Sequence, residues 1–255
     1  MAVAVSMGVP FGGVVRCSGW VIGSLAPHLE RENVRSHKEK QVAAALSRPN
    51  VLPHHVATLG GMSRSPEGGR TSEARARLLG TATRIFYAEG IHSVGVDRII
   101  AEAQVTRATL YRHFSGKEDL VLAYLDQADK GIRAQIGAAQ ASGGTAADKV
   151  RAVGTSITEG IRSPGFRGCA FLNAAAEYPD PAHPIHQTVL AHRQWFLNTV
   201  TDLLAQVGDA PADLAGRHLV MLRDGAMAAG CLFDPKLVSE TFLHGVEGIL
   251  QARLG

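Results

Sequence analysis

Residues 96–117 gather cationic and hydroxyl side chains, in the order VDRIIAEAQVTRATLYRHFSGK. Within this segment the run 106–113 contains two arginines and no acidic residue. Guanidinium groups suit guanine edges or phosphates, hydroxyls suit phosphates, and a small side chain allows close approach to bases. A helix of about eight residues is about 12 Å long, which suits the width of a DNA major groove. The run therefore has the chemistry for non-covalent recognition of double-stranded DNA.

The spacing of apolar residues predicts that this run is a short helix. Thr106 is a natural N-cap, because its hydroxyl can accept a free backbone N–H of the first turn. Leu110 and Phe114 follow Thr106 at steps of four residues, so they share one side and are expected to point into the core. Ala108 and Arg112 then lie on the opposite side and face away from the protein. The outward-facing set is expected to be Arg107, Ala108, Thr109, Tyr111, Arg112 and His113.

Two further helices are predicted to flank this one. Apolar residues recur at three- and four-residue steps over 96–103, and residues 103–105 form a turn. On the other side, Ser115 is expected to be an N-cap that forms a capping box with Glu118. Lys117 lies in that first turn and can reach a phosphate beside the groove. The pattern predicts a helix-turn-helix; the alternative is a helical segment whose basic face is only solvated.

The segment resembles the DNA-binding domain of the TetR (tetracycline repressor) family. The resemblance covers about residues 71–130 and rests on the run VTRATLYRHF at 105–114, followed by KEDL at 117–120. It implies that Thr106 caps the recognition helix and touches phosphate. The residues that it implies face bases or nearby phosphates are Arg107, Ala108, Thr109 and Arg112. Those that it implies grip the DNA backbone are Tyr111, His113 and Lys117.

Two positions depart from the family pattern. Gln104 stands where a turn glycine is common, and a left-handed backbone there would cost about 1–2 kcal/mol. Gly95 stands where a serine or threonine usually caps the helix that begins at residue 96. The missing side-chain cap costs a few tenths of a kcal/mol of stability. Neither departure is expected to prevent the fold.

The predicted fold is all-α. An N-terminal three-helix helix-turn-helix domain occupies 71–117, and a helical regulatory and dimerisation domain occupies 118–255, with a connecting helix at about 117–136. Residues 1–70 show little periodicity and are expected to be a disordered extension or an upstream translation artefact, with Met62 as the biological start. The other helices are expected at 72–89, 147–161, 169–178, 183–207, 212–229 and 236–254, with a loop at 138–145.

Charge is divided unevenly along the chain. The whole sequence has a formal net charge of +3. Residues 62–117 hold nine Lys/Arg and five Asp/Glu, whereas residues 118–255 hold eleven and fifteen. The DNA-reading part is thus cationic and the remainder anionic, as electrostatic attraction to phosphate requires.

The last two predicted helices are rich in Leu, Met, Ala and Gly and carry few charges. This composition suits a helix pair that packs against its twin in a four-helix dimer interface; the alternative is an intramolecular core. A homodimer would place two recognition helices on half-sites about one helical turn apart, which predicts a palindromic operator.

The resemblance also implies a small-molecule effector, whose identity the residues do not give. Its pocket could be lined by Phe171, Trp195, Phe196, Met221 and Phe233, with polar groups that orient the ligand. Those polar groups would be Asn173, His192 and Asp224. The alternative is that each of these residues is ordinary core.

Other chemistry has weaker support. The cysteines, Cys17, Cys169 and Cys231, form no metal or disulfide pattern, so we expect a reducing cytoplasm. We interpret Cys169 and Cys231 as small buried hydrophobes; the alternative is that they sense oxidants. The histidines at 183, 186 and 192 lack convincing metal-ligand spacing and are expected to be solvated. No membrane-spanning run, catalytic constellation or cofactor motif is recognisable. We therefore expect a transcriptional regulator, without cofactor or metal and most simply a repressor, ahead of a helical binding module without specific DNA binding, and an enzyme last.

Overall fold

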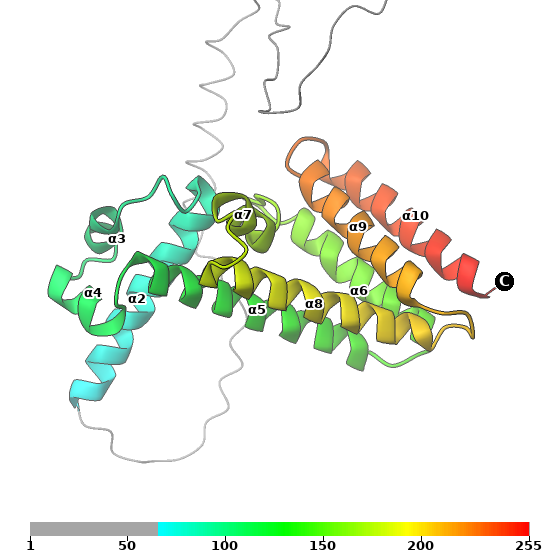
Figure 1. The fold of residues 1–255 in the computed structure, drawn as a ribbon, viewed down its shortest axis with the longest axis horizontal. Coiled ribbons are helices and arrows are strands. Elements are labelled where there is room, and N and C mark those ends of the chain that lie inside the picture. Colours follow the sequence, from blue (N-terminus) through cyan, green and yellow to red (C-terminus); the bar gives the residue numbers. More distant parts are fainter. Residues whose placement is uncertain (1–65, 255) are drawn as a thin grey trace, which may run out of the picture. The chain divides into compact units, whose positions relative to one another are not determined.

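The computed structural model describes residues 66–254, and within that range every regular element is an α-helix (Figure 1). The predicted all-α class is therefore confirmed. The expectation for the N-terminal extension and for Met62 lies outside the described residues. The helices are α2 (Pro66–Glu89), α3 (Val96–Glu102), α4 (Arg107–His113), α5 (Lys117–Ala141), α6 (Ala146–Ile161), α7 (Ala170–Glu177), α8 (Pro184–Ala205), α9 (Asp213–Ala229) and α10 (Pro235–Leu254).

The first three of these helices form the predicted helix-turn-helix with its bracing helix. Helix α2 packs on α3, α4 and α5. It begins six residues before the predicted residue 72, and its first residue is a proline, which suits the first turn of a helix. The side chains of this part's core that are fully buried include Leu78, Ile85, Ile99, Leu110 and Leu120.

Helix α5 corrects two predictions. Its N-cap is Gly116, which is in an extended conformation, so the capping box predicted between Ser115 and Glu118 is wrong. The Ser115 backbone N–H donates instead to Asp119 Oδ2 at 2.9 Å. The helix also runs to Ala141, into the predicted loop, because the run AAQA at 138–141 favours helix until two glycines with positive φ follow.

Helices α6–α10 form the remaining part of the fold. Helix α6 contacts α5, α8, α9 and α10, so its apolar face lies in the middle of this group. It begins with a genuine capping box between Thr145 and Asp148. Figure 1 shows α9 (orange) and α10 (red) side by side, as the contacts between them require.

The turn between α3 and α4 contains the one non-glycine residue with positive φ in the described part of the chain. Gln104 has φ 53°, so it adopts the left-handed conformation that costs a residue with a Cβ about 1–2 kcal/mol. The turn is closed by the Val105 N–H, which donates to Ile100 O at 3.2 Å. A glycine would adopt this backbone without the steric penalty that a Cβ brings.

We predict that Gln104→Gly raises the free energy of unfolding by about 1 kcal/mol, because it removes the left-handed strain. Urea unfolding followed by circular dichroism measures this. The matched control is Gln140→Gly, the same change in a right-handed helical turn of α5, which should lower stability instead. A loss of stability in Gln104→Gly would contradict the strain argument.

Candidate DNA-binding surface

Helix α4 has the cap and the orientation that its sequence predicts. The Thr106 hydroxyl accepts the Thr109 backbone N–H at 3.1 Å. Leu110 and Phe114 are buried, with 0% and 2% of their surfaces exposed. Ala108 and Arg112 are exposed on the other side. The helix ends at His113 because Phe114 is in an extended conformation.

Most of the predicted contact residues lie on one exposed face of α4. Tyr111 is 51% exposed, an unusual degree for an aromatic side chain in a folded domain. Thr109 is half-buried, and its hydroxyl lies 2.8 Å from that of Thr106. Arg107 is exposed, but its guanidinium is paired with Asp97 of α3. Arg107 must leave this partner to bind DNA, and because both side chains are solvent-exposed the loss is small.

Two predicted contact residues are less open. His113 is half-buried, and its ring Nε2 is buried without a hydrogen-bond partner. Lys117 is half-buried in the first turn of α5, and burial lowers its pKa from the ordinary value while the Glu177 carboxylate opposes this effect. Lys117 thus sits beside α4 as predicted, whereas the buried ring nitrogen of His113 is not presented to a phosphate.

A depression of about 290 Å³ lies between α2, the turn and α4. It is lined by Ala74, Arg77, Gln104, Val105, Thr106, Thr109, Arg112 and His113. Arg77 was not among the predicted contact residues, because it lies on α2, about 30 residues from the recognition run. Its guanidinium is held by Glu73 at 3.1 Å. The depression brings Arg77 and Arg112 to one hollow beside the exposed face.

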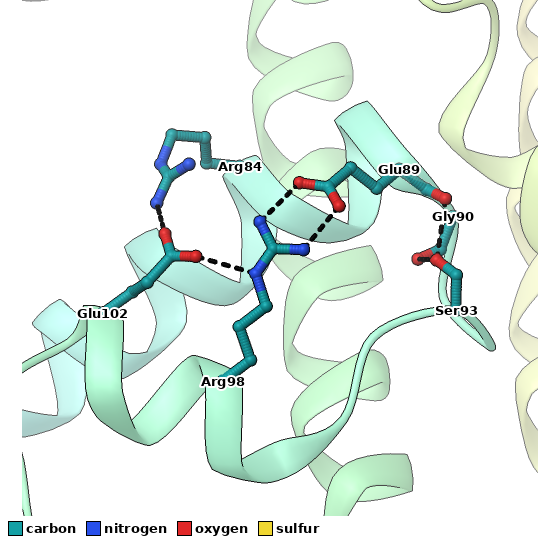
Figure 2. Close-up of polar contacts among 6 residues, drawn as sticks. All are labelled: Arg84, Glu89, Gly90, Ser93, Arg98 and Glu102. Carbon is teal, nitrogen blue, oxygen red and sulfur yellow. Dashed lines mark hydrogen bonds and ion pairs between the residues drawn. The ribbon is translucent and has the colours of Figure 1, made fainter.

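An ionic network fastens α3 to α2 (Figure 2). Arg98 of α3 donates to both carboxylate oxygens of Glu89, at 2.5 and 2.7 Å, and to Glu102 at 2.8 Å. Arg84 of α2 pairs with the other oxygen of Glu102. Hydrogen bonds from Arg98 lower the pKa of Glu89, and those from Arg84 and Arg98 lower that of Glu102. Exposed pairs add little stability, but the bidentate geometry fixes the angle of α3 on α2.

The loop after α2 is held by a residue 86 positions further along the chain. The two oxygens of Glu177, the last residue of α7, accept the backbone N–H groups of Ile91, at 2.8 Å, and of His92. Gly90, with φ 92°, ends α2 here, and a Cβ on it would lie 3.4 Å from the same carboxylate. One side chain of α7 therefore positions the loop that leads to α3.

A second link joins α2 to the segment before α7. The Tyr87 hydroxyl donates to Gly168 O and accepts the Arg167 N–H, each at 2.9 Å. Burial raises the pKa of Tyr87, so its hydroxyl keeps the proton that it donates. Both ends of α7 are therefore tied to the last turn of α2 or to the loop after it.

Four of the predicted effector-pocket residues do lie together. The rings of Phe171 and His192 are stacked, with centroids 3.6 Å apart, and Trp195 and Phe196 pack next to them. His192 is 3% exposed, so the expectation that it is solvated is wrong. Its Nδ1 lies 2.6 Å from Asp129 of α5, a partner 63 residues away that no local pattern reveals. Burial lowers the pKa of His192, so it is uncharged at neutral pH.

The other pocket residues have different surroundings. Asp224 is paired with Arg193 and Arg223, so it is already engaged rather than free to orient a ligand. Asn173 donates to Arg167 O in the segment before α7. Met221 and Phe233 are 71% and 65% exposed and do not join the aromatic cluster.

A larger depression of about 520 Å³ opens beside this cluster, between α5, α6 and α8. Trp195 borders it, with the Arg133 guanidinium 4.1 Å from its ring centroid. The lining residues are Arg133, Ile136, Gly137, Gln140, Lys149, Trp195, Thr199, Asp202, Leu203 and Gln206. Among the predicted residues only Trp195 borders this space.

Between 66 and 254 no group of three or more His, Cys, Asp or Glu side chains could hold a metal ion. None of the helices described is long and apolar enough to cross a membrane.

Known proteins that resemble this chain are helix-turn-helix regulators of the TetR family. A family model for bacterial regulatory proteins of the tetR family matches residues 78–124. A solved TetR-family transcriptional regulator from Streptomyces coelicolor is 80% identical, with a TM-score of 0.72, over 72% of this chain and 97% of that one.

Curated relatives are more distant. The HTH-type transcriptional regulator YjdC of Escherichia coli is 27% identical over 162 residues, which are 62% of this chain and 81% of that protein. The HTH-type transcriptional activator FasR of Mycolicibacterium smegmatis is 42% identical over 55 residues, 22% of this chain and 25% of that protein.

We predict that Glu177→Ala lowers the free energy of unfolding by about 1–3 kcal/mol, because the buried Ile91 N–H loses its acceptor. Glu177→Gln keeps one acceptor oxygen and should lose less. Chemical denaturation measures both. The control, Glu159→Ala, changes an exposed residue of α6 and should stay within about 0.5 kcal/mol of the parent. Equal effects at both sites would show that the Glu177 contacts do not matter.

Proposed function

The chain belongs to the TetR family of bacterial transcriptional regulators, and we propose that it is a dimeric repressor that a small molecule releases from its operator. It is a DNA-binding regulator of the helix-turn-helix type. The observation that carries the proposal is the exposed, acid-free face of α4, which Thr106 caps and Leu110 anchors.

The proposed contact residues of α4, its cap and the first turn of α5 divide into those that read bases and those that clamp the DNA backbone. Ala108 and Arg112 project opposite the buried Leu110, so they enter the major groove deepest and read base edges. Arg107 joins them when it leaves Asp97. Phosphate contacts fix the register of the helix without reading sequence. The clamps are Thr106, Thr109, Tyr111, His113 and Lys117, and His113 serves only after its ring turns outward.

The outer faces of α9 and α10 supply the dimer interface. Large apolar side chains stay exposed there and in the turn between the two helices, namely Leu214, Met221, Leu232, Phe233 and Leu237. Glycines 225 and 248 have no atom within 4 Å of an added Cβ, so they leave room for close approach of a second helix pair. A second copy would bury this surface and set the spacing of the two α4 helices.

The regulatory signal passes through α7. An effector that binds beside Phe171, His192, Trp195 and Phe196 must open the packed cluster, and Asn173, Met221 and Asp224 have no direct place in this proposal. Phe171 belongs to α7, and Glu177 at the end of the same helix holds the loop before α3. An effector with higher affinity for the state in which α7 has shifted would lower the affinity for DNA by the same coupling free energy.

The alternative is a helical ligand- or protein-binding module without specific DNA binding. Binding to the DNA that flanks the chain's own gene, compared with random duplex at physiological salt, separates the two. Equal affinity for both duplexes would contradict the regulator proposal.

We predict that Arg112→Ala weakens specific binding by about 1–3 kcal/mol, roughly 5- to 150-fold in Kd, and relaxes specificity. Lys117→Gln should weaken binding to all sequences alike and reduce the slope of log K against log salt by about 1. Fluorescence anisotropy over a salt series measures both effects. The control, Arg162→Ala, removes the same charge from an exposed position after α6 and should leave specific binding unchanged.

We predict that Leu237→Glu dissociates the dimer, because it places two carboxylates in an apolar interface. Sedimentation velocity measures the mass of the particle. Leu190→Glu is the matched control, since Leu190 is an exposed leucine of α8 outside the α9/α10 face. The interface assignment fails if Leu190→Glu dissociates the dimer and Leu237→Glu does not.

A further inference from the structure

Cys169 occupies the N-cap position of α7 without acting as a cap. Its backbone is extended, with φ −83° and ψ 121°, but its side chain accepts no N–H from the first turn. Residues at this position usually carry an oxygen that does so. The first turn of α7 therefore lacks a side-chain acceptor beside the sulfur of Cys169, which is 5% exposed.

A buried guanidinium points at the same sulfur. Arg223 is 4% exposed, and its Nη2 donates to Cys169 Sγ at 3.4 Å. Its Nε is buried and has no hydrogen-bond partner. The Nε–Nη2 edge of an arginine fits two oxygens of one anion, whereas a thiol sulfur is a weak acceptor. The Nε–Nη2 edge of Arg223 therefore contacts one weak acceptor, the sulfur of Cys169, although it could bind two oxygens.

The charged groups around Arg223 also lack one negative charge. Arg193 and Arg223 share one carboxylate, that of Asp224. The nearby Asp129 is paired with Arg133, and His192 is uncharged because burial lowers its pKa. The cluster thus carries one positive charge more than its carboxylates neutralise, next to a sulfur that can acquire oxygen.

We propose that Cys169 is an oxidation site for hydrogen peroxide, and that Arg223 and the first turn of α7 hold the oxygens of the product. The sulfur attacks one peroxide oxygen, an S–O bond forms, and the O–O bond breaks. The sulfur loses two electrons, and the leaving hydroxide takes the thiol proton to become water, which leaves a sulfenic acid. A second hydrogen peroxide oxidises the sulfenic acid to a sulfinic acid in the same way, and loss of the acid's proton to water leaves a sulfinate with its negative charge against Arg223.

The oxidised sulfur would act on the helix-turn-helix through the peptide segment at Gly168. Gly168 precedes Cys169 with φ 83°, and its carbonyl accepts the Tyr87 hydroxyl of α2. The space around Gly168 is tight, because an added Cβ would lie 3.3 Å from Cys231 Sγ. Oxygens added to Cys169 displace this segment and, through Tyr87, the end of α2. This consequence rests on the proposed DNA-binding function, whereas the oxidation itself does not.

Cys231 provides an internal comparison. It is exposed in the turn after α9, and its thiol donates to Met227 O. Exposure alone ranks Cys231 above Cys169 for reaction with peroxide. Oxidation that favours Cys169 therefore reports the guanidinium contact rather than accessibility.

The first test measures where oxygen is added. The full chain is treated with hydrogen peroxide, and peptides that contain Cys17, Cys169 and Cys231 are weighed by mass spectrometry. The Cys231→Ser variant serves as the background, so that no disulfide to Cys231 consumes the product. In the Cys231→Ser variant we expect one- and two-oxygen adducts on Cys169. These adducts should form several times faster than the adducts on Cys231 in the parent chain. Arg223→Lys, which keeps the charge but loses the fork, should lower the rate on Cys169 severalfold.

Preferential oxidation of Cys231 or Cys17, or an unchanged rate in a folded Arg223→Lys variant, would overturn the proposal. Thermal unfolding shows whether that variant is folded. If it is not, Cys169→Asp replaces it. Its carboxylate imitates the sulfinate, so we expect a higher melting temperature than for Cys169→Asn, and no difference would count against the proposal.

The second test measures the consequence for DNA. Peroxide should raise the Kd for the operator about tenfold in the parent and in Cys231→Ser, and not in Cys169→Ser, whose hydroxyl can cap α7 but is not oxidised. An equal rise in the operator Kd of Cys169→Ser and of the parent after peroxide treatment would contradict the proposed effect of Cys169 oxidation on DNA binding. Failure of the untreated parent to bind any operator would sink the proposed function instead, while the mass measurement still decides the oxidation site.

Discussion

A seven-residue helix is too short to be stable in water by itself, and α4 has seven residues. Its helical conformation therefore depends on its neighbours: the Thr106 cap at one end, the burial of Leu110 along its length and that of Phe114 just past its end. Burial of these side chains uses the whole inner face, so the outer face is left entirely to solvent or DNA. The same constraint explains why α2 is long and why α3 is fastened to it at the Arg98–Glu89 pair. Helix α3, which also has seven residues and has no side-chain cap, depends on its neighbours in the same way.

Local signals explain what the sequence could predict. The cap, the four-residue spacing of Leu110 and Phe114, and the left-handed turn at Gln104 are all encoded within a dozen residues, and the structure has each of them. The Ser115 box failed because capping depends on the backbone conformation at Gly116, which the residue types do not determine. The end of α5 was missed because a loop was inferred from small residues that also favour helix.

Long-range contacts explain what the sequence could not predict. Glu177 meets Ile91 and His92 across more than 80 residues, and no periodicity links them. His192 was interpreted as solvated because its position beside a proline-rich segment suggests a surface, yet Asp129 and Phe171 enclose it. The sequence grouped aromatic residues of α7 and α8 correctly, but it could not show that Met221 points away from them. The apolar face of a helix is predictable from that helix alone. The helix that packs against this face depends on how all the helices pack together.

The arrangement of α7 gives the coupling a physical basis. This helix has eight residues; the segment before it is bonded to Tyr87, and its last residue to the loop that starts at Gly90. An eight-residue helix moves nearly as a rigid body, so a displacement at Cys169 or at Phe171 is felt at Glu177. Both bonds reach α2 within its last turn or just beyond it, where the chain departs toward α3 and α4. Because α3 is fastened to α2 and α4 packs on both, a displacement of α7 would, under the proposed function, change the placement of α4 without unfolding it. Such a bond-linked rigid element can have two placements of similar energy, and a ligand or a modification that favours one of them changes the affinity for DNA.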